Sequence, residues 1–121
     1  MSLQSYKDLI VWQKSFQLAK DIYKLTDKMP ASEKFALSSQ IQRSAVSIPS
    51  NIAEGQQRNN IKEYRHFIGI AKGSAGELET QLLLVKDIYG LESAQILKTI
   101  QEIQKMLRSL YLKLEPSTSN L

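Results

Sequence analysis

The stretch from Ile61 to Tyr89 constrains the fold of this chain more than any other. Its apolar residues recur at gaps that alternate between three and four, at Ile61, Tyr64, Ile68, Ala71, Ala75, Leu78, Leu82, Val85 and Tyr89. This spacing is the a/d seam of a helix that packs lengthwise against other helices. Asn60 can cap the start, with Glu63 completing a capping box, and Gly90 can end the helix in the left-handed conformation. The sequence therefore predicts one long helix here.

Three further segments have helical periodicity. The first is expected over residues 6–28, with Ser5 as its N-cap, and the last over residues 92–113. The middle one follows Pro30, with Ser32 as another candidate cap, and its apolar stripe is Phe35, Ser38, Ile41, Ala45, Ile48 and Ile52. This register continues through Pro49, which predicts one helix kinked at the proline rather than two helices.

Short turns near Pro30, Arg58 and Gly90 separate these helices, and no segment alternates as a β-strand does. The predicted fold class is all-α, an antiparallel up-and-down four-helix bundle. One domain is expected over residues 1–115, with residues 116–121 as a flexible polar tail.

The N-terminal helix carries more apolar surface than a surface helix needs. One stripe is Leu9, Trp12, Phe16, Ala19 and Tyr23, and a second is Val11, Leu18, Ile22, Leu25 and Met29. Two interpretations remain open. The helix lies deep in the bundle and touches two neighbours, or one stripe meets another subunit.

Composition narrows the function classes. The chain has 121 residues, no cysteine, a net charge of +4 and a single histidine. Without cysteine there are no disulfides and no thiolate metal sites, which suits a cytoplasmic location. No apolar run is long enough to cross a membrane, and the first residues lack the apolar core of a signal peptide. The basic balance favours polyanionic partners.

Catalytic and metal-binding patterns are missing from the sequence. A di-iron bundle needs two Glu-x-x-His pairs, and Glu63 with His66 is the only one. There is no G-x-S-x-G motif, and the segment from Gly73 to Gly76 lacks the spacing of a phosphate loop. We therefore expect no enzyme activity, metal, cofactor or small-molecule substrate, and we interpret His66 as a surface or interface residue.

Three glycines lie on the side of the long helix opposite its apolar seam, namely Gly69, Gly73 and Gly76. Each costs a helix about 1 kcal/mol relative to alanine. Small residues let a second backbone approach closely, and Ile70 on the same side would then be covered. We interpret Gly69, Ile70, Gly73 and Gly76 as an oligomer interface. Close packing within the bundle is the alternative.

Four polar residues lie beside the proline and on the long helix, namely Arg43, Asn51, Glu54 and Glu77. A satisfied polar network would fix the register of the packed helices. The same residues could instead line a ligand pocket, and the sequence leaves both interpretations open.

Basic residues recur at helical spacing along one side of the same region, at Arg58, Lys62, Arg65 and Lys72. Like charges one turn apart repel each other. A phosphate backbone would offset this repulsion, which predicts a nucleic-acid surface. The alternative is that acidic residues of another helix neutralise the stripe.

Several segments together resemble one known family. They are residues 40–55, QIQRSAVSIPSNIAEG; residues 70–80, IAKGSAGELET; residues 9–13, LIVWQ; and residues 30–33, PASE. The chain is similar to the proteins encoded in intervening sequences of bacterial 23S rRNA genes. That resemblance implies a four-helix bundle that assembles into a ring, often a pentamer. A related branch comprises accessory proteins of the reverse transcriptases of diversity-generating retroelements, which bind the polymerase and nucleic acid. The resemblance assigns no catalytic or binding residue.

Together these features predict a non-enzymatic, homo-oligomeric basic bundle, a pentameric ring if the resemblance extends to assembly. We expect it to associate with RNA, DNA or a protein that handles nucleic acid. The alternative is a protein-interaction scaffold without a nucleic-acid role.

Overall fold

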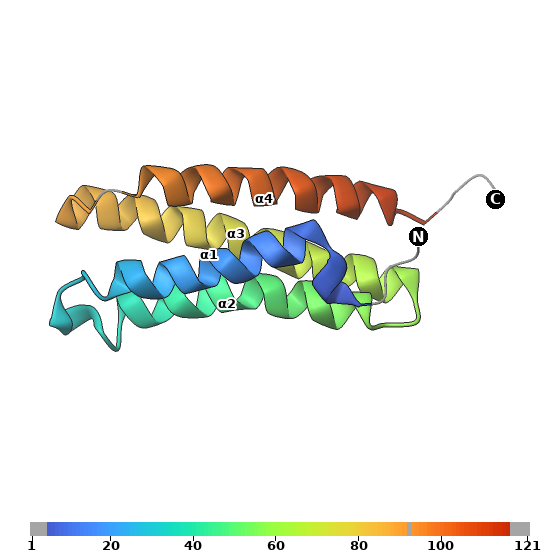
Figure 1. Ribbon diagram of the computed structural model, residues 1–121, viewed down its shortest axis with the longest axis horizontal. Coiled ribbons are helices and arrows are strands. Elements are labelled where there is room, and N and C mark those ends of the chain that lie inside the picture. Colours follow the sequence, from blue (N-terminus) through green and yellow to red (C-terminus); the bar gives the residue numbers. More distant parts are fainter. Residues whose placement is uncertain (1–4, 92, 117–121) are drawn as a thin grey trace.

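The computed structural model describes residues 5–91 and 93–116, which form four long helices (Figure 1). The helices are α1 (Ile10–Thr26), α2 (Leu37–Gln56), α3 (Ile61–Tyr89) and α4 (Ala94–Lys113), with short 3-10 helices η1 (Tyr6–Asp8) and η2 (Ala31–Glu33). No strand occurs in the described part of the chain. The predicted all-α class with four helices is therefore confirmed.

Hydrogen bonds between the helices define their relative directions. Ser44 pairs with Glu77, and Ser47 pairs with Ser74, so residue numbers rise along α2 while they fall along α3. The same reversal relates α3 to α4 through the pairs Arg65 with Tyr111 and Glu79 with Gln104. Figure 1 shows the chain turning back at each connection, so that sequential helices lie side by side.

The ends of α3 are capped by the residues that the sequence indicated. Asn60 Oδ1 accepts a hydrogen bond from the Glu63 N–H at 3.0 Å. Gly90 has φ 66°, and its N–H donates to the Lys86 carbonyl oxygen at 2.9 Å. The Glu63 carboxylate faces Arg58 at 3.7 Å instead of returning to Asn60, so no side-chain hydrogen bond completes the capping box.

The predicted first helix is interrupted at Leu9, which has extended backbone angles. Ser5 therefore caps η1, where its hydroxyl accepts from the Lys7 N–H at 3.0 Å, and α1 begins only at Ile10. Two contacts hold η1 against α1. The Tyr6 and Trp12 rings meet edge to face with centroids 5.3 Å apart, and the Gln13 amide donates to the Lys7 carbonyl oxygen. These contacts outweigh the local preference for an uninterrupted helix.

The start of α2 was predicted wrongly. Phe35, assigned to the apolar stripe of this helix, lies before α2 and is 90% exposed, and Ser32 does not cap it. Glu33 explains the difference, because its carboxylate accepts hydrogen bonds from the Tyr89 hydroxyl and the Leu37 N–H. The turn is thereby held to α3, and helix resumes only after Ala36.

The rest of α2 continues through Pro49 as one helix, and a kink there stays a prediction. Helix α4 starts at Ala94, two residues later than predicted, and Glu92 lies outside the described residues. Of the predicted tail, residues 117–121 lie outside them too.

The core is built from one side of each helix. In α1 and just after it, the second stripe is buried throughout, at Val11, Leu18, Ile22, Leu25 and Met29. In α3 the a/d seam is buried from Ile68 to Val85. No helix in the described ranges has the length and apolar content to cross a membrane.

Candidate self-association and nucleic-acid surfaces

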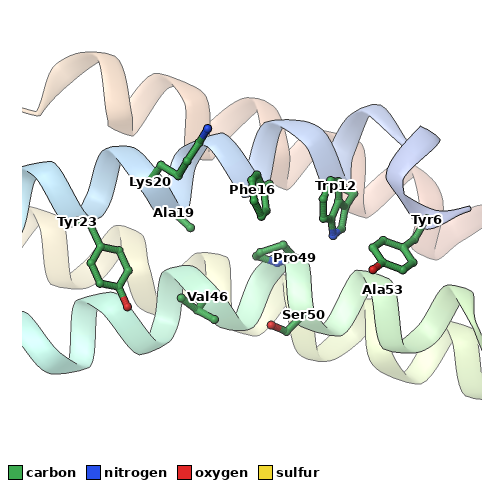
Figure 2. Close-up of a pocket in the computed structure, with 10 residues that line it drawn as sticks. All are labelled: Tyr6, Trp12, Phe16, Ala19, Lys20, Tyr23, Val46, Pro49, Ser50 and Ala53. Carbon is green, nitrogen blue, oxygen red and sulfur yellow. The ribbon is translucent and has the colours of Figure 1, made fainter.

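A groove between α1 and α2 contains most of the first apolar stripe of α1 (Figure 2). Its volume is about 470 Å³, and we call it the aromatic groove; it is lined by Tyr6, Trp12, Phe16, Ala19, Lys20, Tyr23, Val46, Pro49, Ser50 and Ala53. The Trp12 and Phe16 rings stack with centroids 4.9 Å apart. Lys20 is the one charged side chain among the described residues that line it, and its ammonium lies 5.5 Å from the Phe16 ring centroid.

The aromatic groove stays uncovered in the single chain. Phe16 is 47% exposed, and Tyr23 and Val46 are exposed to a similar extent. Helix α1 packs against both α2 and α4, as one of the two interpretations required, but these neighbours cover its first stripe only in part. An apolar surface remains available for a contact outside the protomer.

A second uncovered surface lies on the side of α3 away from the core. A Cβ atom added at Gly73 or Gly76 would have nothing within 4 Å, whereas at Gly69 it would meet the Tyr111 ring at 3.4 Å. Ile70 is exposed beside these glycines. Of these three glycines, only Gly69 therefore packs against another described part of its own chain.

The same side of α3 continues into apolar residues that the sequence analysis missed. Leu83, Leu84 and Ile88 are exposed, and Ile88 is the most exposed of the three, at 61%. Their helical spacing from Gly73 and Gly76 places them along the same side and was a usable signal. We call Ile70, Gly73, Gly76, Leu83, Leu84 and Ile88 the α3 outer face.

The predicted basic stripe divides into two environments. Arg58 lies 3.2 Å from the Glu54 carboxylate and 3.7 Å from that of Glu63, and its guanidinium lies 4.8 Å from the Phe67 ring centroid. Glu54 of α2 and Glu63 of α3 itself therefore compensate its charge, whereas the alternative interpretation expected acidic residues of another helix along the whole stripe. Lys62 is exposed and forms no ion pair with any described residue.

Arg65 and Lys72 both lie against Tyr111 of α4. The Arg65 guanidinium is 3.7 Å from the ring centroid, and the Lys72 ammonium is 4.3 Å from it. Arg65 Nε also donates to the Tyr111 carbonyl oxygen at 3.1 Å. The aromatic ring attracts both cations without neutralising them. The sequence analysis did not identify Tyr111.

Two of the four predicted polar residues lie in the α2/α3 interface. Asn51 Nδ2 donates to the carbonyl oxygen and hydroxyl of Ser47 at 2.8 and 2.9 Å. The hydroxyls of Ser47 and Ser74 are 2.7 Å apart, and Ser44 donates to the Glu77 carboxylate at 2.8 Å. We call these five residues the serine ladder. Two of its bonds cross between α2 and α3, and Asn51 is joined to that line of contact through Ser47 of its own helix. This arrangement favours the structural interpretation for Asn51 and Glu77.

The other two polar residues lie elsewhere. Glu54 pairs with Arg58, and Arg43 is exposed at a shallow hollow beside Tyr23 and Val46. The four residues do not form one network. His66 is exposed, and its ring packs edge to face on Phe67. Within residues 5–91 and 93–116, no group of three His, Cys, Asp or Glu residues could hold a metal ion.

Known proteins resemble this chain in sequence and in fold. Residues 7–111 match the model of the family described as 23S rRNA-intervening sequence protein. A solved structure from Bacteroides thetaiotaomicron VPI-5482, a protein of unknown function from the S23 ribosomal protein family, is 30% identical, with a TM-score of 0.77. The match covers 84% of this chain and 98% of that one. No curated protein matches the chain.

Proposed function

Because this chain belongs to the 23S rRNA-intervening sequence protein family, we propose that it is a non-enzymatic bundle that assembles with copies of itself and associates with RNA. A protein that handles nucleic acid is an equivalent partner for the same basic surface. The assembled form would be a ring, and the family resemblance suggests a pentamer.

One observation carries the self-assembly: the protomer leaves two different apolar surfaces uncovered. The aromatic groove lies between α1 and α2, and the α3 outer face lies on another helix. A contact between two different surfaces is head-to-tail, and it generates a ring when the rotation closes. The α3 outer face of one copy would occupy the aromatic groove of the next.

The open space around Gly73 and Gly76 supports the same contact. Each glycine costs α3 about 1 kcal/mol relative to alanine. No described residue of the protomer occupies the space that their missing side chains leave. A neighbouring helix that approached closely at these positions would offset the cost by burying Ile70 before the glycines and Leu83 and Leu84 after them.

The assembly can be tested by breaking each surface separately. Gly73→Leu places a side chain on the α3 outer face, and Val46→Glu places a charge in the aromatic groove. Light scattering should show each variant as a single chain, with helical content near that of wild type by circular dichroism. Val46→Ala is the matched control, because it keeps the groove apolar and should keep the native mass.

Mixing the two variants tests whether the contact is head-to-tail. The Gly73→Leu chain retains its groove, and the Val46→Glu chain retains its α3 outer face. An equimolar mixture should therefore form a heterodimer with one intact contact and nothing larger. A wild-type protein that is a single chain at tens of micromolar would contradict the proposal, as would native mass for Gly73→Leu.

The nucleic-acid association is supported by charge. The chain carries a net charge of +4, and Lys62, Arg65 and Lys72 form no ion pair with described residues. A ring would repeat this surface once per subunit, which multiplies weak binding. Phosphate contacts of this kind give salt-sensitive binding with little dependence on sequence.

A charge reversal tests this part. Lys62→Glu combined with Arg65→Glu should weaken the binding of RNAs and DNAs of different sequence to the same degree. Lys24→Glu combined with Lys28→Glu makes the same change in net charge on exposed positions of α1 and the turn after it, and should weaken binding less. Equal affinity in wild type and in the Lys62→Glu, Arg65→Glu variant would count against the nucleic-acid association. The absence of binding by wild type at low salt would also count against it.

The uncovered aromatic groove also suits a second candidate function, a scaffold that binds only proteins. Isolation of the protein from its native cell separates the two candidates. RNA and protein would both be identified in the eluate. Recovery of proteins without RNA would favour the scaffold.

A further inference from the structure

Positive charge gathers where α3 and α4 meet around Tyr111. The ring lies within 4.3 Å of both the Arg65 guanidinium and the Lys72 ammonium. Arg108 precedes Tyr111 by one helical turn, so it lies on the same side of α4, and it is exposed. None of these three cations pairs with an acidic side chain in the described part of the chain.

Arg65 is held in a defined orientation. Its Nε donates to the Tyr111 carbonyl oxygen at 3.1 Å, and its guanidinium lies 3.7 Å from the ring centroid. Its two terminal amino groups donate no hydrogen bond to other described residues. An oriented guanidinium with both terminal groups available is suited to bidentate contact with a phosphate.

One acidic side chain farther along α3 is already engaged. Glu79 accepts a hydrogen bond from the Gln104 amide at 3.2 Å. Glu79 follows Lys72 by two helical turns, so the basic stretch is bounded on that side. The α3/α4 junction therefore carries three cations around Tyr111, and its charge becomes mixed beyond them, at Glu79 on α3 and at Glu115, which follows Tyr111 by four residues.

We propose that the surface where α3 and α4 meet around Tyr111 binds the phosphodiester backbone of a nucleic acid, with Arg65, Lys72 and Arg108 contacting phosphate oxygens. Tyr111 is a positioning residue that orients Arg65. The proposal rests on the proposed nucleic-acid association and narrows it to one side of the bundle. Arg58 is left out, because Glu54 and Glu63 already compensate its charge.

The same geometry determines which part of a nucleic acid the site contacts. Base-stacking sites need an aromatic face that is open to the base. Two cations already lie against the Tyr111 ring. The site therefore contacts phosphates rather than bases, and it binds with little sequence preference.

The test measures binding of a labelled single-stranded RNA of mixed sequence to the full chain at several salt concentrations. Arg65→Lys keeps the charge but loses the planar fork and the Nε bond, and it should weaken binding about tenfold. Arg108→Gln should lower the slope of log affinity against log salt by about 0.7. Lys86→Gln removes one charge from the other end of α3 and is the matched control, with affinity and slope near those of wild type.

Tyr111 is tested through its coupling to Arg65. Tyr111→Phe keeps the ring and should bind as wild type does. Tyr111→Leu should weaken binding in the wild-type background but add little in the Arg65→Lys background, because both changes remove the same orientation. If circular dichroism shows that Tyr111→Leu does not fold, Arg65→Lys and Arg108→Gln decide the matter.

Each contrary result identifies which of the two proposals is wrong. Wild-type affinity and slope in both Arg65→Lys and Arg108→Gln would overturn the phosphate site and leave the proposed RNA association standing. An equal loss in Lys86→Gln would also overturn the site, because binding would then follow net charge alone. Failure of wild type to bind the RNA at low salt would overturn both proposals.

Discussion

At the scale of single residues, the glycines in the helices of this bundle have opposite environments. A Cβ atom at Gly55 would lie 2.9 Å from Phe67 Cβ and 3.1 Å from the Tyr64 carbonyl oxygen. No atom of another described segment would lie within 4 Å of a Cβ atom at Gly73. Helices α2 and α3 therefore approach each other closely near the turn that joins them, and Gly55 is what permits that approach.

Gly55→Ala should lower the free energy of unfolding by about 1–3 kcal/mol, because the added methyl group meets backbone and Cβ atoms that cannot move independently. Alanine's better helix propensity would offset part of this cost. Urea denaturation measures the change. Gly73→Ala is the control. When it is measured at a concentration where the protein is a single chain, it should raise the free energy of unfolding by up to about 1 kcal/mol. A more stable Gly55→Ala protein would mean that the two helices are not in close contact there.

Tyr89 links α3 to the turn before α2. Its hydroxyl donates to Glu33, and this hydrogen bond raises the pKa of Tyr89 above its ordinary value of 10.0. Burial and the charge of Glu33 act in the same direction as smaller causes. The neutral phenol is therefore favoured in the folded protein relative to the unfolded chain.

The stability that this bond contributes should be present below pH 10 and lost as the pH rises through the raised pKa of Tyr89. Glu33→Gln should bring the pKa of Tyr89 closer to its ordinary value and reduce the loss of stability at alkaline pH. The difference between the phenolate absorbance titrations of wild type and Tyr89→Phe isolates this residue. A Tyr89 that titrates at or below its ordinary value would contradict the assignment.

At the scale of the elements, the serine ladder gives α2 and α3 a polar line of contact beside their apolar core. The Ser47 and Ser74 hydroxyls bond to each other, and Asn51 also donates to Ser47. A partly buried hydroxyl that loses its partner costs more than the net value of the bond it made. The ladder therefore favours one axial register of α2 on α3 over displaced ones.

A double-mutant cycle on Ser47 and Ser74 tests this contribution. Ser47→Ala and Ser74→Ala should each lower the free energy of unfolding by about 1 kcal/mol. The double variant should cost clearly less than the sum of the two, with a coupling of roughly 1 kcal/mol. Denaturation of the four proteins under identical conditions gives the coupling. Additive costs would mean that the two hydroxyls do not depend on each other.

At the scale of the whole molecule, the bundle buries one side of each helix and leaves apolar surface on α1, α2 and α3. The proposed head-to-tail contact would cover both surfaces at once. Assembly that occurs only in the folded state stabilises that state by mass action.

The melting temperature of wild type should consequently rise with protein concentration, by a few degrees for about 1 kcal/mol of added stabilisation. The melting temperature of Gly73→Leu should not change with concentration. Calorimetric or circular-dichroism melts over a wide concentration range make the comparison. A wild-type melting temperature that does not depend on concentration, together with the mass of a single chain, would contradict the proposed assembly.

The sequence by itself determined the helices and their buried sides. The bounds of α3, the cap at Asn60 and the left-handed Gly90 were all predicted, because periodicity and capping depend on residues within one or two turns. The outward position of the glycines followed from the same spacing. The predictions were wrong at Leu9 and Phe35. Near Leu9 the Tyr6 ring contacts Trp12, and near Phe35 Glu33 accepts a hydrogen bond from Tyr89, and these contacts determine the local backbone conformation.

Only the tertiary structure decided which surfaces are covered and which cations are compensated. Arg65 and Tyr111 are 46 residues apart, and no local pattern relates them. Likewise, the two stripes of α1 look equivalent in sequence, yet one is buried and the other lines the aromatic groove. Helical spacing states which side chains share a face. The packing of the other helices decides what that face meets, because it depends on the shapes and charges of the whole set.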